Sequence, residues 1–164
     1  MTTWPTDFSA ENLLGLLTVH GVDFVVIGGV AAVAHGSPRL TQDLDVVFAP
    51  DAANLSVLGK ALVEMNARPR GVEDDVPFVA DARTLANVQV LTLTTDFGSL
   101  DVMVRPDGCP PYPQLRRRAE RVEVGAFGVL IASIPDLIGM KRAAGRPKDL
   151  ADIVELQAIQ RLRR

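Results

Sequence analysis

The stretch that decides the fold runs Ile27-Gly28-Gly29-Val30-Ala31-Ala32-Val33-Ala34-His35-Gly36-Ser37-Pro38-Arg39-Leu40-Thr41-Gln42-Asp43-Leu44-Asp45. It begins where the run from Asp23 to Ile27, which is rich in β-branched residues, predicts a buried central strand. Two glycines follow this strand directly, and the small residues of 30–35 favour a short helix that packs tightly on a sheet. Gly36-Ser37-Pro38 ends that helix. Residues 43–48 form the next predicted strand.

Asp43 and Asp45 are two residues apart on this strand, so their carboxylates project from one face of the sheet. Their α-carbons are then roughly 6.6 Å apart, which lets the side chains converge on one divalent ion or on two. Two like charges on a sheet face repel each other, so a fold seldom places them there without a cation. The alternative is an edge strand whose acids face water, and Asp-x-Asp alone does not exclude it.

Three neighbouring features strengthen the metal interpretation. The Gly28-Gly29 pair at a helix start allows close backbone approach and offers N–H groups to a phosphate, although a tight packing turn would use the same residues. Arg39 could bind a triphosphate through two N–H groups, orient an aspartate, or form a surface ion pair. Asp101 follows a predicted hairpin turn at 96–98. If its strand pairs beside the Asp43 strand, a spacing of about 4.8 Å brings a third carboxylate to the same ion.

The rest of the chain alternates helical and strand patterns. Helices are expected at 9–20, 51–66, 114–119, 134–145 and 147–161, and strands at 88–94, 100–104, 120–124 and 129–132, with loops at 68–81 and 106–113. This order predicts an α/β or α+β domain in which helices flank a mixed central sheet. The length of 164 residues favours one domain over 1–164, with C-terminal helices at about 134–162 packed on the core.

Composition excludes some classes of function. The net charge of −3 is not that of a general nucleic-acid binder. Basic residues nevertheless cluster at 116–118 and 161–164, where they could attract phosphate or simply be solvated. Cys109 is the single cysteine, so no internal disulfide is possible. The N-terminus lacks a secretory pattern and no apolar run is long enough for a membrane span, so we expect a cytoplasmic protein without a membrane partner.

The motif from Ile27 to Asp45 resembles the DNA polymerase β-type nucleotidyltransferase superfamily, and in particular the minimal nucleotidyltransferases related to the AbiEii and MenT toxins. Their pattern is Gly-Gly, a short helix, and Arg-x-Thr-x-Asp-[Leu/Ile]-Asp. The resemblance continues in Pro135-Asp136-Leu137-Ile138-Gly139-Met140-Lys141 and in Gly145-Arg146-Pro147-Lys148-Asp149-Leu150-Ala151-Asp152. Residues 51–87 match no familiar pattern, and Gly-Gly replaces the Gly-Ser of many superfamily members.

The resemblance implies a polymerase β-like fold and a role for each matched residue. Asp43, Asp45 and Asp101 would be catalytic and would hold Mg²⁺ or Mn²⁺, and Lys141 would be a catalytic contact to the phosphates. The nucleotide-binding residues would be Gly28, Gly29, Arg39, Thr41, Arg146, Lys148 and Asp149. Among the C-terminal candidates, Lys141 ranks above Asp149 and Asp149 above Asp152. The helix dipole is an alternative explanation for Lys141 near a helix C-terminus and for Asp149 near a helix N-terminus.

The resemblance also predicts a function. The protein would transfer a nucleoside monophosphate from an NTP, ATP among them, to an acceptor hydroxyl at a tRNA 3′ end, as the toxin of a toxin–antitoxin pair with a cognate antitoxin protein. A small-molecule antibiotic or a partner protein is an alternative acceptor. A non-catalytic nucleotide-binding or antitoxin-like module is an alternative of another class. The sequence names neither the acceptor, the preferred NTP nor the oligomeric state.

Overall fold

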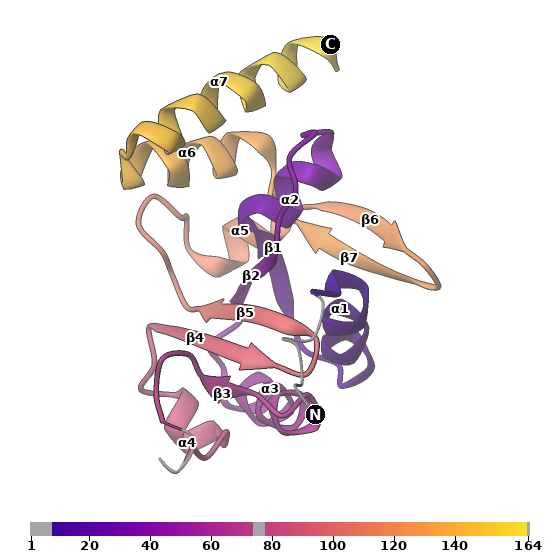
Figure 1. Cartoon of the computed structure of the whole chain (residues 1–164), viewed down its shortest axis with the longest axis vertical. Helices are drawn as coiled ribbons and strands as arrows, with labels where there is room; N and C mark the ends of the chain where they lie inside the picture. Colours follow the sequence, from indigo (N-terminus) through magenta and orange to yellow (C-terminus); the bar gives the residue numbers. More distant parts are fainter. Residues whose placement is uncertain (1–7, 74–77, 164) are drawn as a thin grey trace.

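A seven-stranded mixed sheet forms the centre of the described chain, with the strand order β3-β4-β5-β2-β1-β7-β6 (Figure 1). We describe a computed structural model over residues 8–73 and 78–163. The strands are β1 (Phe24–Ile27), β2 (Asp43–Phe48), β3 (Arg68–Pro69), β4 (Val90–Thr95), β5 (Gly98–Met103), β6 (Glu120–Val124) and β7 (Phe127–Ile131). Because β2 pairs parallel with β5 and antiparallel with β1, the sheet is mixed, as predicted.

The helices are placed around this sheet in two groups. They are α1 (Ala10–Val19), α2 (Gly28–His35), α3 (Ala52–Glu64), α4 (Ala82–Leu85), α5 (Tyr112–Arg118), α6 (Ile134–Ala144) and α7 (Pro147–Leu162). Helices α6 and α7 pack on each other at one end of the molecule, beside α2, whereas α3 and α4 lie near β3 and β4 at the opposite end (Figure 1). Among the described residues, no helix combines the length and apolar character needed to cross a bilayer.

Burial fixes which face of the sheet points inward. In β2, β4 and β5, Leu44, Leu93 and Leu100 are fully buried and belong to one hydrophobic cluster. Most residues that alternate with them on the same strands are more exposed, Asp43 and Thr92 among them, although Val47 is buried. Period-two alternation of this kind is what a sheet with one covered face requires. The acidic motif therefore lies on the less covered face.

Several element boundaries differ from the sequence prediction. Helix α2 begins at Gly28 rather than Val30, because Gly28 adopts φ +67 and turns the chain directly from strand into helix. The predicted loop 68–81 contains the two-residue strand β3, and the short helix α4 follows it. The remaining expected helices and strands are present to within a few residues. Ser9 caps α1 by accepting the Asn12 N–H at 3.2 Å.

Candidate functional site

Two of the predicted catalytic carboxylates are placed side by side by strand pairing. Asp45 on β2 is the register partner of Asp101 on β5, so both side chains leave the same face. On its other side Asp45 pairs with Ile27, the last residue of β1. Gly28 begins α2 immediately above: a Cβ at this position would lie 2.3 Å from Asp45 Oδ2. Only glycine permits this approach at φ +67, so Gly28 leaves the space that the Asp45 carboxylate occupies.

The charges at this point are unbalanced. Burial, the charge of Asp101 and a hydrogen bond with its carboxyl group raise the pKa of Asp45 from 3.8 to about 7. The charge of Asp43 raises the pKa further, and that of Lys141 lowers it. With a pKa of about 7 this carboxyl group is only partly ionised at neutral pH, and a cation beside it favours the charged form, which is the donor chemistry of a divalent-metal site.

Asp43 does not complete a cluster of three ligands. Within residues 8–73 and 78–163, no group of three or more His, Cys, Asp or Glu side chains is arranged to hold a metal ion. Asp43 is exposed at the start of β2, opposite Ser99 rather than opposite an acid. Asp45 and Asp101 remain as an adjacent pair of oxygen donors. This pair fits Mg²⁺, which proteins commonly bind through one or two carboxylates together with substrate phosphates.

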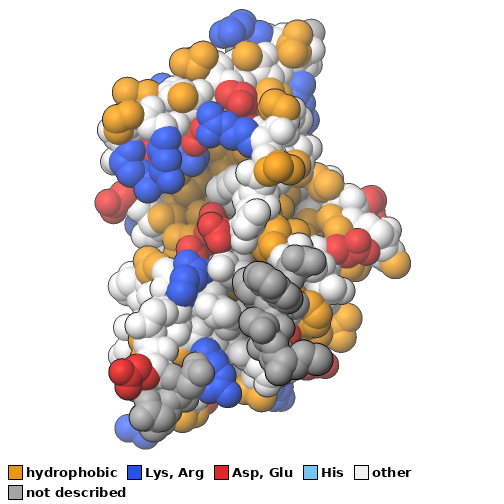
Figure 2. Space-filling view, in the orientation of Figure 1, with side chains coloured by type: hydrophobic (Ala, Val, Ile, Leu, Met, Phe, Trp, Pro, Cys, Tyr) orange, Lys and Arg blue, Asp and Glu red, His pale blue; other side chains and the backbone are white. Residues whose placement is uncertain are grey.

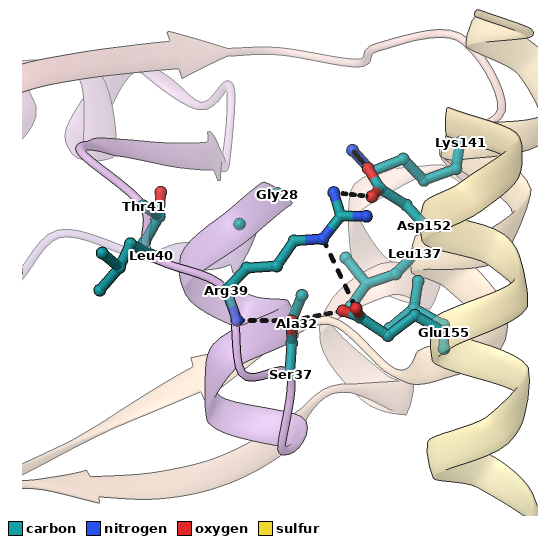
Figure 3. A pocket seen from close by; sticks show the side chains of 12 residues that line it. Gly28, Ala32, Ser37, Arg39, Leu40, Thr41, Leu137, Lys141, Asp152 and Glu155 are labelled. Carbon is teal, nitrogen blue, oxygen red and sulfur yellow. Dashed lines mark hydrogen bonds and ion pairs between the residues drawn. The ribbon is translucent and has the colours of Figure 1, made fainter. Parts of the chain in front are cut away.

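The predicted phosphate ligands lie on the other side of Gly28. Arg39 extends from the segment between α2 and β2 toward α7, where it forms ion pairs with Asp152 and, at 3.5 Å, with Glu155 (Figure 3). Lys141 on α6 reaches the same group, with its Nζ 2.9 Å from Asp152 Oδ2. Ser37 donates a hydrogen bond to Glu155. Lys141 is also 3.5 Å from Asp149 Oδ1, so three carboxylates of α7 contact the two cations.

A pocket opens between these residues and the start of α2. Gly28, Gly29, Arg39, Thr41 and Lys141 all contribute to its lining, so the structure brings together five of the predicted site residues. Helix α2 starts without a side-chain cap, which leaves its first N–H groups available to an anion. Gly29 lets Thr41 approach closely, since a Cβ would lie 2.8 Å from Thr41 Oγ1. The pocket is suited to a phosphate chain.

Arg146, Lys148 and Asp149 have different surroundings. Asp149 is fully buried, and Arg146 and Asp149 form the capping box that begins α7. The hydrogen bond from the Arg146 side chain lowers the pKa of Asp149 to about 2. Arg146 and Asp149 also line a second, mostly apolar pocket with Met140 and Ala144, which adjoins the first at Gly28, Leu137 and Lys141. Lys148 is exposed and lines neither pocket.

Sequence reasoning missed or ranked low several residues of the site. Arg70 donates from Nη2 to Asp101 Oδ1 at 2.8 Å, although its segment was predicted to be loop. Asp152 ranked below Asp149, yet it is Asp152 that faces the phosphate pocket. The spacing of Asp152 and Glu155, one turn apart in a predicted helix, could have indicated Glu155 as a site residue, because residues one turn apart lie on the same side of a helix. Arg70 carried no comparable pattern.

Charged side chains of both signs gather around the site. Figure 2 shows a hollow below α6 and α7, with basic side chains along its upper edge and acidic side chains at its lower edge. An apolar floor is visible between them. The hollow therefore has mostly basic side chains above it and a mixture of acidic and basic side chains below it.

Solved structures with a similar fold are nucleotidyltransferases. The lincosamide antibiotic adenylyltransferase LnuA with lincomycin bound is 16% identical with a TM-score of 0.62, covering 93% of this chain and 99% of that chain. ANT(2")-Ia in complex with adenylyl-2"-tobramycin is 13% identical with a TM-score of 0.55, covering 92% and 90%. An antigenic nucleotidyltransferase-like protein from Paracoccidioides brasiliensis is 17% identical with a TM-score of 0.50, covering 89% and 72%. The fold is therefore that of the polymerase β-like nucleotidyltransferases.

The family follows from the sequence as a whole. The family model described as "Nucleotidyl transferase AbiEii toxin, Type IV TA system" matches residues 16–163. The chain belongs to this family of nucleotidyltransferase toxins and is a transferase enzyme. No curated protein sequence matches it. The predicted family and reaction class are thus confirmed, while the roles of individual site residues stay predictions.

Proposed function

We propose that the protein transfers a nucleoside monophosphate from an NTP to the 3′-terminal hydroxyl of a tRNA, in a Mg²⁺-dependent reaction, as the toxin of a pair with a cognate antitoxin. The observation that carries the proposal is the Asp45–Asp101 pair held under Gly28 beside a pocket lined by Arg39 and Lys141. One side of this site supplies carboxylates and the other supplies cations, as a nucleotide and a metal require.

The carboxylates have two tasks in this proposal. Asp45 and Asp101 would hold Mg²⁺, and a bound Mg²⁺ neutralises charge on the triphosphate. Asp101 accepts the proton of the acceptor hydroxyl, and that oxygen then forms a bond to the α-phosphorus as the bond to the β-phosphate oxygen breaks. The products are the nucleotidylated acceptor and pyrophosphate, with one proton released. Arg70, bonded to the Oδ1 atom of Asp101, holds this carboxylate in position.

The cations position the leaving group. Gly28 and Gly29 at the start of α2 line the same pocket as Arg39 and Lys141. The helix N–H groups and the two cations can therefore hold the β- and γ-phosphates in line with attack. Asp152 and Glu155 form ion pairs with these cations, so in this proposal the phosphates take the place of these carboxylates as partners.

A labelling screen tests the function. The full chain is incubated with total tRNA, Mg²⁺ and each of the four NTPs labelled at the α-phosphate, with parallel samples containing EDTA. We expect label on the tRNA 3′ end with at least one NTP, and none with EDTA. Asp45→Asn should abolish transfer, whereas Glu123→Gln, an exposed charge removal on β6 at the far end of the sheet, should not.

Other acceptors are compared in the same screen. Lincomycin and tobramycin are added in place of tRNA, since proteins of the same fold have been solved with lincomycin and with adenylyl-2"-tobramycin. Label on an antibiotic and none on tRNA would refute the RNA acceptor while keeping the reaction. Growth inhibition that is unchanged in Asp45→Asn would instead favour a non-catalytic binding module.

A further inference from the structure

The open face of the sheet forms two polar rows that lead away from the carboxylates. One row crosses β2, β5 and β4 as Asp45, Asp101 and Thr92, which are successive register partners. The chain after β3 extends this row, since the Arg70 N–H donates to Thr92 O at 2.9 Å. Cross-strand partners share a face, so Arg70 lies on the side of the carboxylates and its guanidinium crosses Thr92 to reach Asp101.

The second row runs beside the first. It crosses β2, β5, β4 and β3 as Asp43, Ser99, Thr94 and Arg68. Asp43, Thr94 and Arg68 are exposed. Three strand spacings of about 4.8 Å give a platform about 14 Å long from β2 to β3. Each row therefore starts at an aspartate of the candidate site and ends at an arginine.

Both arginines are placed to meet an anion. Arg70 leaves 38% of its side chain exposed, and its contacts to Asp101 and to Leu93 O both use Nη2 alone. A guanidinium has five N–H donors, so this arrangement is compatible with an additional bidentate contact to phosphate. Arg68 is exposed at the outer end of its row. Figure 2 shows basic side chains beside the acidic ones over this part of the sheet.

The basic clusters that the sequence suggested for RNA are used differently. Arg116 donates to Asp23 at 3.1 Å, and Arg118 is paired with the buried Asp136. Arg163 pairs with Glu120 at 2.9 Å and also contacts His35. Internal ion pairs therefore occupy arginines in both clusters, which weakens the case for either as the surface that meets a phosphate backbone.

We propose that the open face of β3, β4 and β5 binds the 3′-terminal strand of an RNA acceptor, with Arg68 and Arg70 contacting its phosphates and the terminal hydroxyl at Asp101. This inference rests on the proposed function and specifies where its acceptor lies. A single-stranded RNA end can lie flat on an exposed sheet face, and its phosphates are matched by cations at a fixed distance from the reacting atom.

Direct binding tests the surface without turnover. The wild-type chain is titrated into fluorescently labelled tRNA with Mg²⁺ and no NTP, at several salt concentrations. Arg68→Ala should lower the affinity by about three- to tenfold and reduce the slope of log K against log salt by about 1, as expected for one lost phosphate contact. Arg117→Ala, an exposed arginine of the 116–118 cluster, is the matched control and should leave both nearly unchanged. Arg68 is chosen because Arg70 also holds Asp101.

A crosslinking experiment locates the RNA on the unaltered protein. A tRNA with a photoreactive base at its 3′ end is irradiated with the wild-type chain, and the attached peptide is identified by mass spectrometry. Attachment within 68–70, 90–95 or 98–103 supports the proposal. Attachment confined to 112–118 or 158–163, an Arg117 effect larger than that of Arg68, or no RNA binding would overturn it. RNA bound on this face without label transfer would refute the proposed reaction and leave the surface standing.

Discussion

The crowding of negative charge at Asp45 makes a quantitative prediction for Asp45→Asn. An aspartate titrates near 3.8 in the unfolded chain, and the folded protein raises the pKa of Asp45 to about 7. Between these values the folded state binds more protons, so the free energy of unfolding decreases as the pH rises. Between about pH 5 and about pH 7, an interval of about two pH units, this decrease amounts to about 2–3 kcal/mol. The side chain of Asn does not titrate, so the free energy of unfolding of Asp45→Asn does not show this decrease.

The measurement is thermal unfolding of both proteins in EDTA at about pH 5 and about pH 8. On going from the lower to the higher pH, the free energy of unfolding of Asp45→Asn should rise by about 2–3 kcal/mol relative to that of the wild type. This corresponds to about 5–10 °C in Tm for a chain of this size. Asp43→Asn removes the same charge from an exposed position and should gain less. A variant that gains nothing on going to the higher pH would show that burial and carboxylate crowding do not destabilise this site.

Magnesium provides the second half of the test. A cation that joins Asp45 and Asp101 offsets the same repulsion, so Mg²⁺ should stabilise the wild type at about pH 8 by about 2.7 kcal/mol when present at 100 times its Kd. Asp45→Asn should gain much less from Mg²⁺. Equal stabilisation of both proteins would place the ion elsewhere.

Two further substitutions test the phosphate side of the site. Gly28→Ala places a methyl group 2.3 Å from Asp45 Oδ2, so it should abolish transfer and lower the free energy of unfolding by about 1–3 kcal/mol. The control Gly21→Ala, at φ +75 with nothing within 4 Å, should lower it by only about 1 kcal/mol and keep activity. Equal losses of activity in the two variants would contradict the close approach of Gly28 to Asp45. Lys141→Ala should raise the KM for NTP by about tenfold or more, because it removes a phosphate contact; initial rates of labelling measure this. Arg142→Ala, at the exposed neighbouring position, should change the KM little. Similar effects of both substitutions would indicate only a general loss of positive charge.

The sequence predicted the strand that carries the site accurately for a physical reason. Alternation of acids with Leu44 and Val46 over Asp43–Phe48 defines both a strand and its two faces, and the structure has the same bounds. The placement of Asp101 beside Asp45 was expected only conditionally, because pairing between distant strands leaves no local pattern. The register of β2 with β5 meets that condition.

The residues that were missed or misranked share a different cause. Arg70 follows a strand of two residues, too short for any periodicity, between Pro69 and Gly71. Asp149 and Asp152 lie one turn apart on α7 and both contact Lys141, but Asp149 belongs to the capping box, whereas Asp152 also pairs with Arg39. Burial depends on how α7 rests on its neighbours, and that tertiary placement is absent from the sequence of the helix alone.

The parallel pairing of β2 with β5 has a consequence for how strictly the chain must fold. Because side chains alternate between faces, a shift of one residue in this pairing would move Asp101 among the buried side chains and bring a leucine or valine beside Asp45. Leu100 and Val102 are both fully buried, so such a shift would expose them and is strongly opposed. Burial of Leu100 and Val102 in the hydrophobic core therefore selects the register of β2 with β5. Only a chain folded in this register has Asp45 and Asp101 side by side.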